Sequence, residues 1–108
     1  LAMQAACEDV HVDDDLERYI VEVVTRTREH SQVEVGASPR GSLALMKLGR
    51  ASAALKGRDY VVPDDVKAVA VEALAHRILL KPDPWIKGVR TASIVREVLA
   101  AVPVPKVE

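Results

Sequence analysis

Aromatic residues are scarce in this chain: they make up 3% of its 108 residues, and phenylalanine is absent. Hydrophobic residues nevertheless make up 49% of the sequence, so the core must be built mainly from Ala, Val, Leu and Ile. Small aliphatic side chains let helices approach one another closely, which favours an all-α fold. The length corresponds to one domain.

Cysteine is almost absent as well. Cys7 is the only one, which excludes an intramolecular disulfide and a cysteine-rich metal site. This usage is typical of a reducing compartment, so we expect a cytoplasmic protein. His11, His30 and His76 lie far apart and never pair with Cys or an acidic residue at ligand spacing. We therefore expect no bound metal.

An excess of one charge and long apolar runs are also lacking. Lys and Arg number 15 and Asp and Glu number 16, which gives a formal net charge of -1. A balanced charge argues against a strongly electrostatic contact with nucleic acid or a membrane surface. No apolar run reaches the roughly 20 residues of a transmembrane helix, and the first residues do not form a signal peptide. We expect neither nucleic acid nor a membrane as a partner.

Periodicity and capping residues predict two helices in the first half of the chain. One begins with Asp14 as its N-cap and Glu17 as the capping-box partner, and its buried face follows the i, i+3, i+4, i+7 spacing. The other runs from Pro39 to about Lys56 and stops at Gly57. Because it is apolar on nearly all sides, we expect it at the centre of the bundle. Its main apolar stripe consists of Ala44, Leu48, Ala51 and Leu55.

Two further helices are predicted in the second half. One opens at Pro63, with two aspartates in its first turn. The other starts near Thr91 and ends before Pro103. Between them, the two prolines of residues 81–84 are expected to prevent regular structure. We interpret Trp85, the sole tryptophan, as a packing residue that closes one end of the bundle.

Together these elements predict one all-α domain, a small helical bundle of four main helices plus a short N-terminal helix. Residues 1–9 have the pattern of the tail of a preceding helix, and residues 103–108 are expected to be a C-terminal tail. No internal repeat and no linker-like segment divides the chain. We expect 1–108 to be a single domain and an excerpt of a longer protein.

The segment Gly36-Ala37-Ser38-Pro39-Arg40 is the most informative part of the sequence. Ser38 is a suitable N-cap, Pro39 suits the first helical position, and Gly36 permits a turn that a side chain would forbid. Arg40 would lie at the positive end of the helix, where anions bind, and its guanidinium suits a phosphate. An arginine in the first turn opposes the helix dipole, which points to an external anion. A plain surface arginine is the alternative interpretation.

Other charged residues have simpler explanations. Lys47, Arg50 and Arg58 form a basic edge along the same helix, which we interpret as a solvated flank. We expect Arg58 to form a structural salt bridge with Asp59 or Asp64.

Two further segments carry a family resemblance. Residues 57–66 read Gly-Arg-Asp-Tyr-Val-Val-Pro-Asp-Asp-Val, and residues 74–77 read Leu-Ala-His-Arg. Together with the segment 36–40, they resemble the C-terminal lid domain of MoxR-type AAA+ ATPases, over essentially the whole of residues 10–105. In that family the lid is a small helical bundle that follows an αβα nucleotide-binding core.

The resemblance implies that Arg40 is the sensor-2 arginine, which responds to the γ-phosphate of ATP. It also implies that Gly36, Ser38 and Pro39 shape the turn and cap that hold Arg40. The chain contains no Gly-x-x-x-x-Gly-Lys-Ser/Thr loop and no strand ending in acidic residues to hold magnesium. We therefore expect ATP and Mg in the full-length parent, expected to be an ATPase, and neither cofactor binding nor hydrolysis by this segment alone.

The resemblance implies partners as well. These are the AAA+ core domain of the same chain, the neighbouring subunits of a ring expected to be hexameric, and proteins with von Willebrand factor A domains. The implied function is that of a lid that closes over ATP and couples nucleotide state to the ring of a chaperone-like remodeler. The alternative is a free-standing helical protein-interaction module without a nucleotide role, in which Arg40 would be inert.

Overall fold

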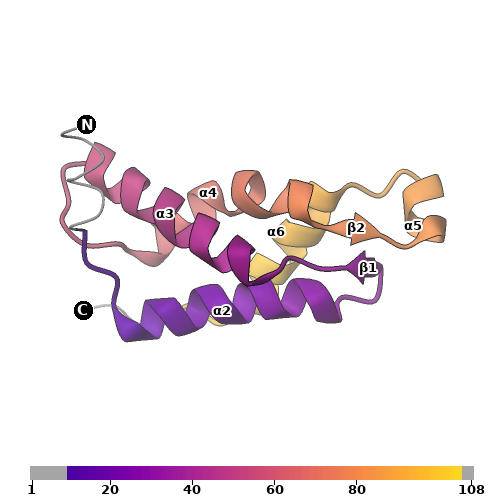
Figure 1. The fold of residues 1–108 in the computed structure, drawn as a ribbon, viewed down its shortest axis with the longest axis horizontal. Helices are drawn as coiled ribbons and strands as arrows, with labels where there is room; N and C mark the ends of the chain where they lie inside the picture. Colours follow the sequence, from indigo (N-terminus) through magenta and orange to yellow (C-terminus); the bar gives the residue numbers. More distant parts are fainter. Residues whose placement is uncertain (1–9, 106–108) are drawn as a thin grey trace.

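The computed structural model describes residues 10–105. Its body consists of four helices: α2 (Asp14–Glu29), α3 (Pro39–Leu55), α4 (Pro63–Leu74) and α6 (Thr91–Ala101). Smaller elements connect them: strand β1 (Val33–Val35), the 3-10 helix η1 (Ala75–Arg77), strand β2 (Leu79–Leu80) and the short helix α5 (Pro82–Ile86). Figure 1 shows α2 and α3 running along the molecule, with β1, β2 and α5 at one end. The predicted bundle of four main helices is confirmed, and the short N-terminal helix predicted at 1–9 lies outside the described residues.

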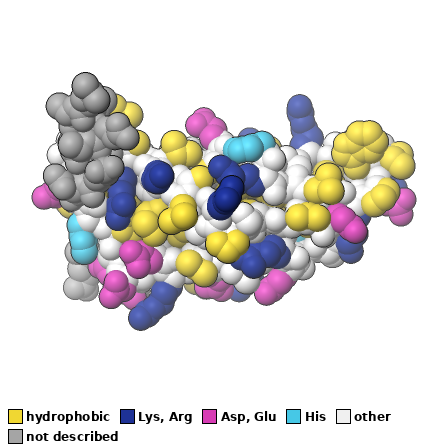
Figure 2. All heavy atoms as spheres, viewed as in Figure 1, with side chains coloured by type: hydrophobic (Ala, Val, Ile, Leu, Met, Phe, Trp, Pro, Cys, Tyr) yellow, Lys and Arg dark blue, Asp and Glu magenta, His cyan; other side chains and the backbone are white. Residues whose placement is uncertain are grey.

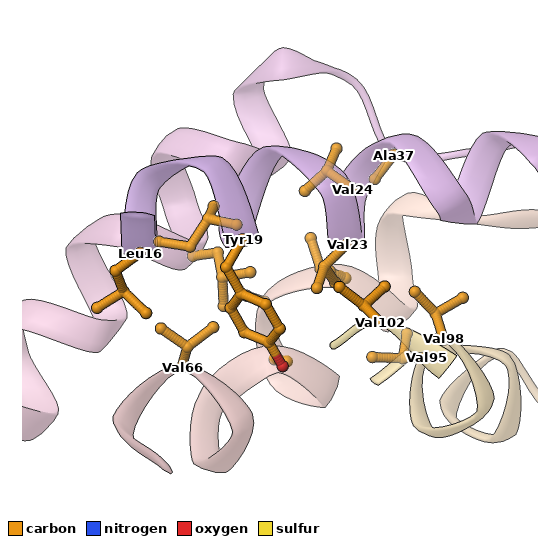
Figure 3. Close-up of a cluster of buried hydrophobic side chains, with 14 of the residues drawn as sticks. Leu16, Tyr19, Val23, Val24, Ala37, Val66, Val95, Val98 and Val102 are labelled. Atoms are coloured by element: carbon orange, nitrogen blue, oxygen red, sulfur yellow. The ribbon is translucent and has the colours of Figure 1, made fainter. Parts of the chain in front are cut away.

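The core is built around α2. Figure 3 shows side chains of α2 pointing toward valines of α4 and α6, among them Val66 and Val95. The apolar face of α2 is buried as its spacing predicts. Its buried residues are Leu16, Tyr19, Ile20, Val23, Val24 and Thr27.

Helix α3 does not lie at the centre, so that prediction is wrong. Two leucines of its predicted stripe are exposed, Leu48 by 37% and Leu55 by 69%. A helix that is apolar on most sides does not reveal which side it buries, and small residues decide the matter here. A Cβ added to Gly49 would lie 3.6 Å from Val61 and 3.8 Å from Val66, so this side packs closely toward α4. The buried residues of α3 are Gly41, Leu45, Gly49 and Ala53.

Two predictions at element boundaries need correction. The N-cap of α2 is Asp13 rather than Asp14, because the Asp13 carboxylate accepts a hydrogen bond from the backbone N–H of Asp15 at 3.3 Å. Residues 81–84 were expected to be irregular, yet α5 forms with Pro82 and Pro84 inside it. Both prolines lie in the first turn, where backbone N–H groups have no helical partner to lose.

The end of the molecule that carries β1, β2 and α5 exposes apolar side chains. The two strands pair antiparallel, and α5 is only 5 residues long. Trp85 is 71% exposed and Ile86 is 73% exposed. The prediction that Trp85 closes the bundle end is therefore wrong, because α5 is too short to cover the ends of the main helices.

A buried ion pair joins the loop after α3 to the first turn of α4. Asp65 has no exposed surface. Its carboxylate accepts two hydrogen bonds from Arg58, at 2.7 and 2.9 Å, one from Ser52 at 3.1 Å and one from the backbone N–H of Val62 at 2.9 Å. Burial raises the pKa of Asp65, but these hydrogen bonds outweigh burial and hold the pKa below its ordinary value. Arg58 thus forms a structural salt bridge, but with neither of the aspartates predicted.

Candidate functional site

The candidate site is the beginning of α3, where the sequence predicts an anion-binding arginine. Ser38 occupies the N-cap position and Pro39 the first helical position, as predicted. The Ser38 hydroxyl, however, makes no capping hydrogen bond. The backbone carbonyl of Ser38 instead accepts a hydrogen bond from the N–H of Gly41 at 2.8 Å. The helix start is therefore stabilised by its backbone and by the proline, and the hydroxyl is left for other partners.

Gly36 is required by a close approach to α2 rather than by its own backbone conformation. A Cβ built on Gly36 would lie 2.5 Å from Cα and Cγ of Arg28, a distance that no side chain tolerates. Positive φ angles within residues 10–105 occur only at Gly57 and Gly88, so the expected special turn is absent at Gly36. A side chain is forbidden at position 36, as expected, but the cause is contact with α2 and not the backbone conformation of a turn.

Thr27 fastens the same loop to α2. Its hydroxyl donates to the carbonyl of Val24 at 2.6 Å and accepts a hydrogen bond from the backbone N–H of Ala37 at 3.1 Å. Thr27 and Ala37 have no exposed surface. Reasoning from the sequence missed Thr27, although a polar residue on the buried face of α2 was an available signal. The loop before Arg40 is thus held by a buried hydrogen bond and by a close backbone contact.

Arg40, the second residue of α3, follows this fixed loop and is exposed to solvent. It forms no salt bridge with another residue in the described part of the chain. Acidic residues occupy the first turns of α2 and α4, whereas the first turn of α3 contains none. A helix N-terminus carries a partial positive charge, and here the guanidinium adds to it. Both charges are open to an external anion, and the planar fork of donors suits phosphate oxygens.

The solvent-facing side of α3 around Arg40 is mostly apolar. Leu43 is 58% exposed, and by helical spacing Leu48 and Leu55 lie on the same half of the helix as Arg40. Lys47 is exposed on this side as well. Exposed leucines on one half of a helix favour a contact with another protein surface.

The predicted basic edge does not form one surface. Lys47 is solvated as expected, but Arg58 is engaged with the buried Asp65. Arg50 is partly buried, and its Nε lies buried without a hydrogen-bond partner in the described segment. Lys47 alone therefore fits the interpretation as a solvated flank.

The remaining polar groups have structural roles. His30 pairs with Glu97 at 2.6 Å between Nε2 and Oε2, and its Nδ1 accepts a hydrogen bond from the backbone N–H of Gln32 at 3.1 Å. This contact joins the end of α2 to α6.

No group of three or more His, Cys, Asp or Glu side chains within 10–105 could hold a metal ion. None of the helices in that range is long and apolar enough to span a bilayer.

Known proteins resemble the chain in both sequence and structure. The family model described as the AAA lid domain matches residues 25–98. The chain is 47% identical, over 95% of its length, to the uncharacterized protein YeaC of Bacillus subtilis, and 34% identical, over 99% of its length, to the chaperone MoxR1 of Mycobacterium tuberculosis. It covers 32% and 31% of these two proteins, about a third of each. The crystal structure of a proposed ATPase from Cytophaga hutchinsonii matches with a TM-score of 0.90 and 34% identity, over 94% of this chain and 34% of that one.

Proposed function

The chain belongs to the AAA lid domain family, as the C-terminal lid of a MoxR-type AAA+ ATPase, and on this premise we propose that it closes over bound ATP with Arg40 as its sensor-2 arginine. The ATP is bound by the nucleotide-binding core of a longer protein, of which 1–108 is the lid. The chain itself has no phosphate-binding loop, so the core supplies most contacts to ATP and Mg. Arg40 adds one positive charge near the γ-phosphate.

The guanidinium of Arg40 at the start of α3, exposed and without a salt bridge to any residue of 10–105, carries this proposal. An arginine that an acidic neighbour neutralised would have little to offer a phosphate, and Arg40 has no such neighbour within 10–105. Gly36 and Thr27 hold the loop before it against α2. Because the backbone before Arg40 is held before the ligand arrives, only the side chain has to reorganise when negative charge develops on the transferred phosphoryl group.

The apolar side of α3 supports the closing movement. Leu43, Leu48 and Leu55 face solvent on the half of the helix that carries Arg40. The AAA+ core of the same chain covers these leucines when the lid closes, which brings Arg40 to the nucleotide. Because Ser52 of α3 donates a hydrogen bond to Asp65 of α4, a displacement of α3 moves α4 with it.

The proposal extends to the assembly. The lid passes nucleotide state to neighbouring subunits of a ring, expected to be hexameric, of a chaperone-like remodeler in the cytoplasm. The family resemblance indicates proteins with von Willebrand factor A domains as partners of that remodeler. The name of one relative, the chaperone MoxR1, supports a chaperone-like role.

Replacing Arg40 with alanine in the full-length ATPase tests the proposal. We expect ATP turnover to fall about ten- to hundredfold, because a charged donor at the transferred phosphate is lost. Arg40→Lys should retain only part of the activity, since an ammonium lacks the planar fork. The unfolding temperature should stay unchanged, because the side chain is exposed.

Arg96→Ala is the matched control, because Arg96 is an exposed arginine on α6. It should leave turnover unchanged. If Arg40→Ala hydrolyses ATP as fast as Arg96→Ala, the sensor role of Arg40 is wrong.

A further inference from the structure

A second arginine lies against the first turn of α3. The Cδ of Arg77, the last residue of η1, is 3.7 Å from the point where a Cβ of Gly41 would stand. Gly41 directly follows Arg40 and is buried. A side chain at position 41 would also approach Leu74 to 3.2 Å and Ala37 to 3.1 Å. The stem of Arg77 therefore lies beside the first turn of α3, next to the residue that follows Arg40.

The guanidinium of Arg77 is held in place without being saturated. Its Nε donates to the carbonyl of Ala73 at 3.0 Å, which satisfies a carbonyl in the last turn of α4. Its terminal nitrogens form no hydrogen bond or salt bridge with residues 10–105, and the side chain is exposed. A fork that is already held in place loses little conformational freedom on binding a ligand.

Arg40 and the stem of Arg77 thus both lie at the positive end of α3, and no carboxylate in the described range forms a salt bridge with either. Figure 2 shows Lys and Arg side chains gathered near the middle of one face of the molecule, beside a histidine. Like charges placed this way repel one another, and an anion with several negative oxygens would relieve the repulsion. Bidentate contacts with such oxygens are what guanidinium groups make best.

We propose that Arg77 is a second phosphate-binding arginine, which shares the terminal phosphate of a nucleoside triphosphate with Arg40. The inference rests on the proposed function of Arg40 and adds a determinant of ligand preference to it. A triphosphate places its outermost negative charge between both guanidinium groups, whereas a diphosphate lacks that charge. Arg77 therefore favours the triphosphate over the diphosphate.

A purely structural role would end at the hydrogen bond with Ala73. Removing Arg77 would then lower the stability of the lid and weaken the binding of both nucleotides alike. Phosphate binding predicts a change in the ratio of the two affinities instead. This ratio separates the two roles even if the variant is less stable.

The experiment measures equilibrium binding of ATPγS and of ADP by the full-length ATPase and its variants. Arg77→Ala should weaken ATPγS binding about tenfold, the equivalent of one charge-assisted hydrogen bond. It should change ADP binding less than about twofold. Arg77→Lys should restore part of the ATPγS affinity, because it returns the charge without the fork. A ratio of ATPγS to ADP affinity in Arg77→Ala equal to that of the control Arg96→Ala would overturn the proposal.

The turnover of Arg40→Ala distinguishes this failure from failure of the proposed function. If Arg40→Ala loses turnover while Arg77→Ala matches Arg96→Ala in both assays, Arg40 is the sensor and Arg77 is structural. If Arg40→Ala also matches Arg96→Ala, the sensor function and the shared site are both wrong.

Discussion

Replacing Asp65 with asparagine is expected to lower the free energy of unfolding of this lid by about 2–3 kcal/mol near neutral pH. Both carboxylate oxygens receive donors, so whichever oxygen becomes the NH2 group places a donor against Arg58. Removing one partner of a buried ion pair typically costs about 3–5 kcal/mol. The loss should be smaller here, because the Arg58 side chain is 24% exposed and water can solvate its freed charge.

The pH dependence provides an independent check. The pKa of Asp65 lies below its ordinary value, because hydrogen bonds outweigh its burial. Such a group contributes stability above its unfolded-state pKa, about 3.9, and loses that contribution as the pH falls through the lower folded-state pKa. The difference in the free energy of unfolding between the wild type and Asp65→Asn should therefore have its full size near neutral pH and become smaller below about pH 4. Urea unfolding followed by far-UV circular dichroism measures it at each pH.

Asp64→Asn is the matched control, since the Asp64 side chain is exposed in the same helical turn. Asp64→Asn should lower the free energy of unfolding by no more than about 0.5 kcal/mol, because only its interaction with the helix dipole becomes weaker. Equal losses for the two variants would refute the reasoning, as would a loss for Asp65→Asn that is the same at low and neutral pH. Either result would mean that the buried pair does not hold the loop after α3 to α4.

Two further predictions concern the loop before α3, and urea unfolding measures both. Thr27→Val should lower the free energy of unfolding by about 1–3 kcal/mol, because it leaves the buried backbone N–H of Ala37 without an acceptor. Thr25→Val on the same helix should lower it by less than about 0.5 kcal/mol. Gly36→Ala should cost about 3 kcal/mol or more, because the new methyl group would lie 2.5 Å from Cα of Arg28. Gly88→Ala, which has open space but a φ of 84°, should cost about 1 kcal/mol. A reversed order within either pair would contradict the packing of this loop.

Helices with one apolar face could be predicted closely from the sequence. The buried residues of α2 follow from spacing alone, since only one of its sides is apolar. The start of α3 at Pro39 and its end before Gly57, whose φ is 77°, follow from capping preferences. Spacing failed for the packing of α3, because most of its sides are apolar and only the neighbouring helices select one of them.

Some features of the candidate site could likewise be predicted from the sequence, and others could not. The position of Arg40 in the first turn of α3 could be predicted, because Ser38 and Pro39 mark a helix start. The contribution of Thr27 could not, because its hydrogen bond to Ala37 depends on how the loop crosses α2. The reason why position 36 requires glycine could not be predicted either, because the backbone that excludes a side chain there belongs to another helix.

The sequence by itself determined, to within one residue, where the four main helices begin, and also which side of α2 is buried and which family the chain resembles. These features depend on interactions among residues a few positions apart and on contiguous motifs. Only the tertiary structure decided that α3 turns apolar residues to solvent, that Arg58 pairs with Asp65, and that Arg77 lies beside the start of α3. The physical reason is that these contacts join different elements, so they exist only once the helices have packed against one another.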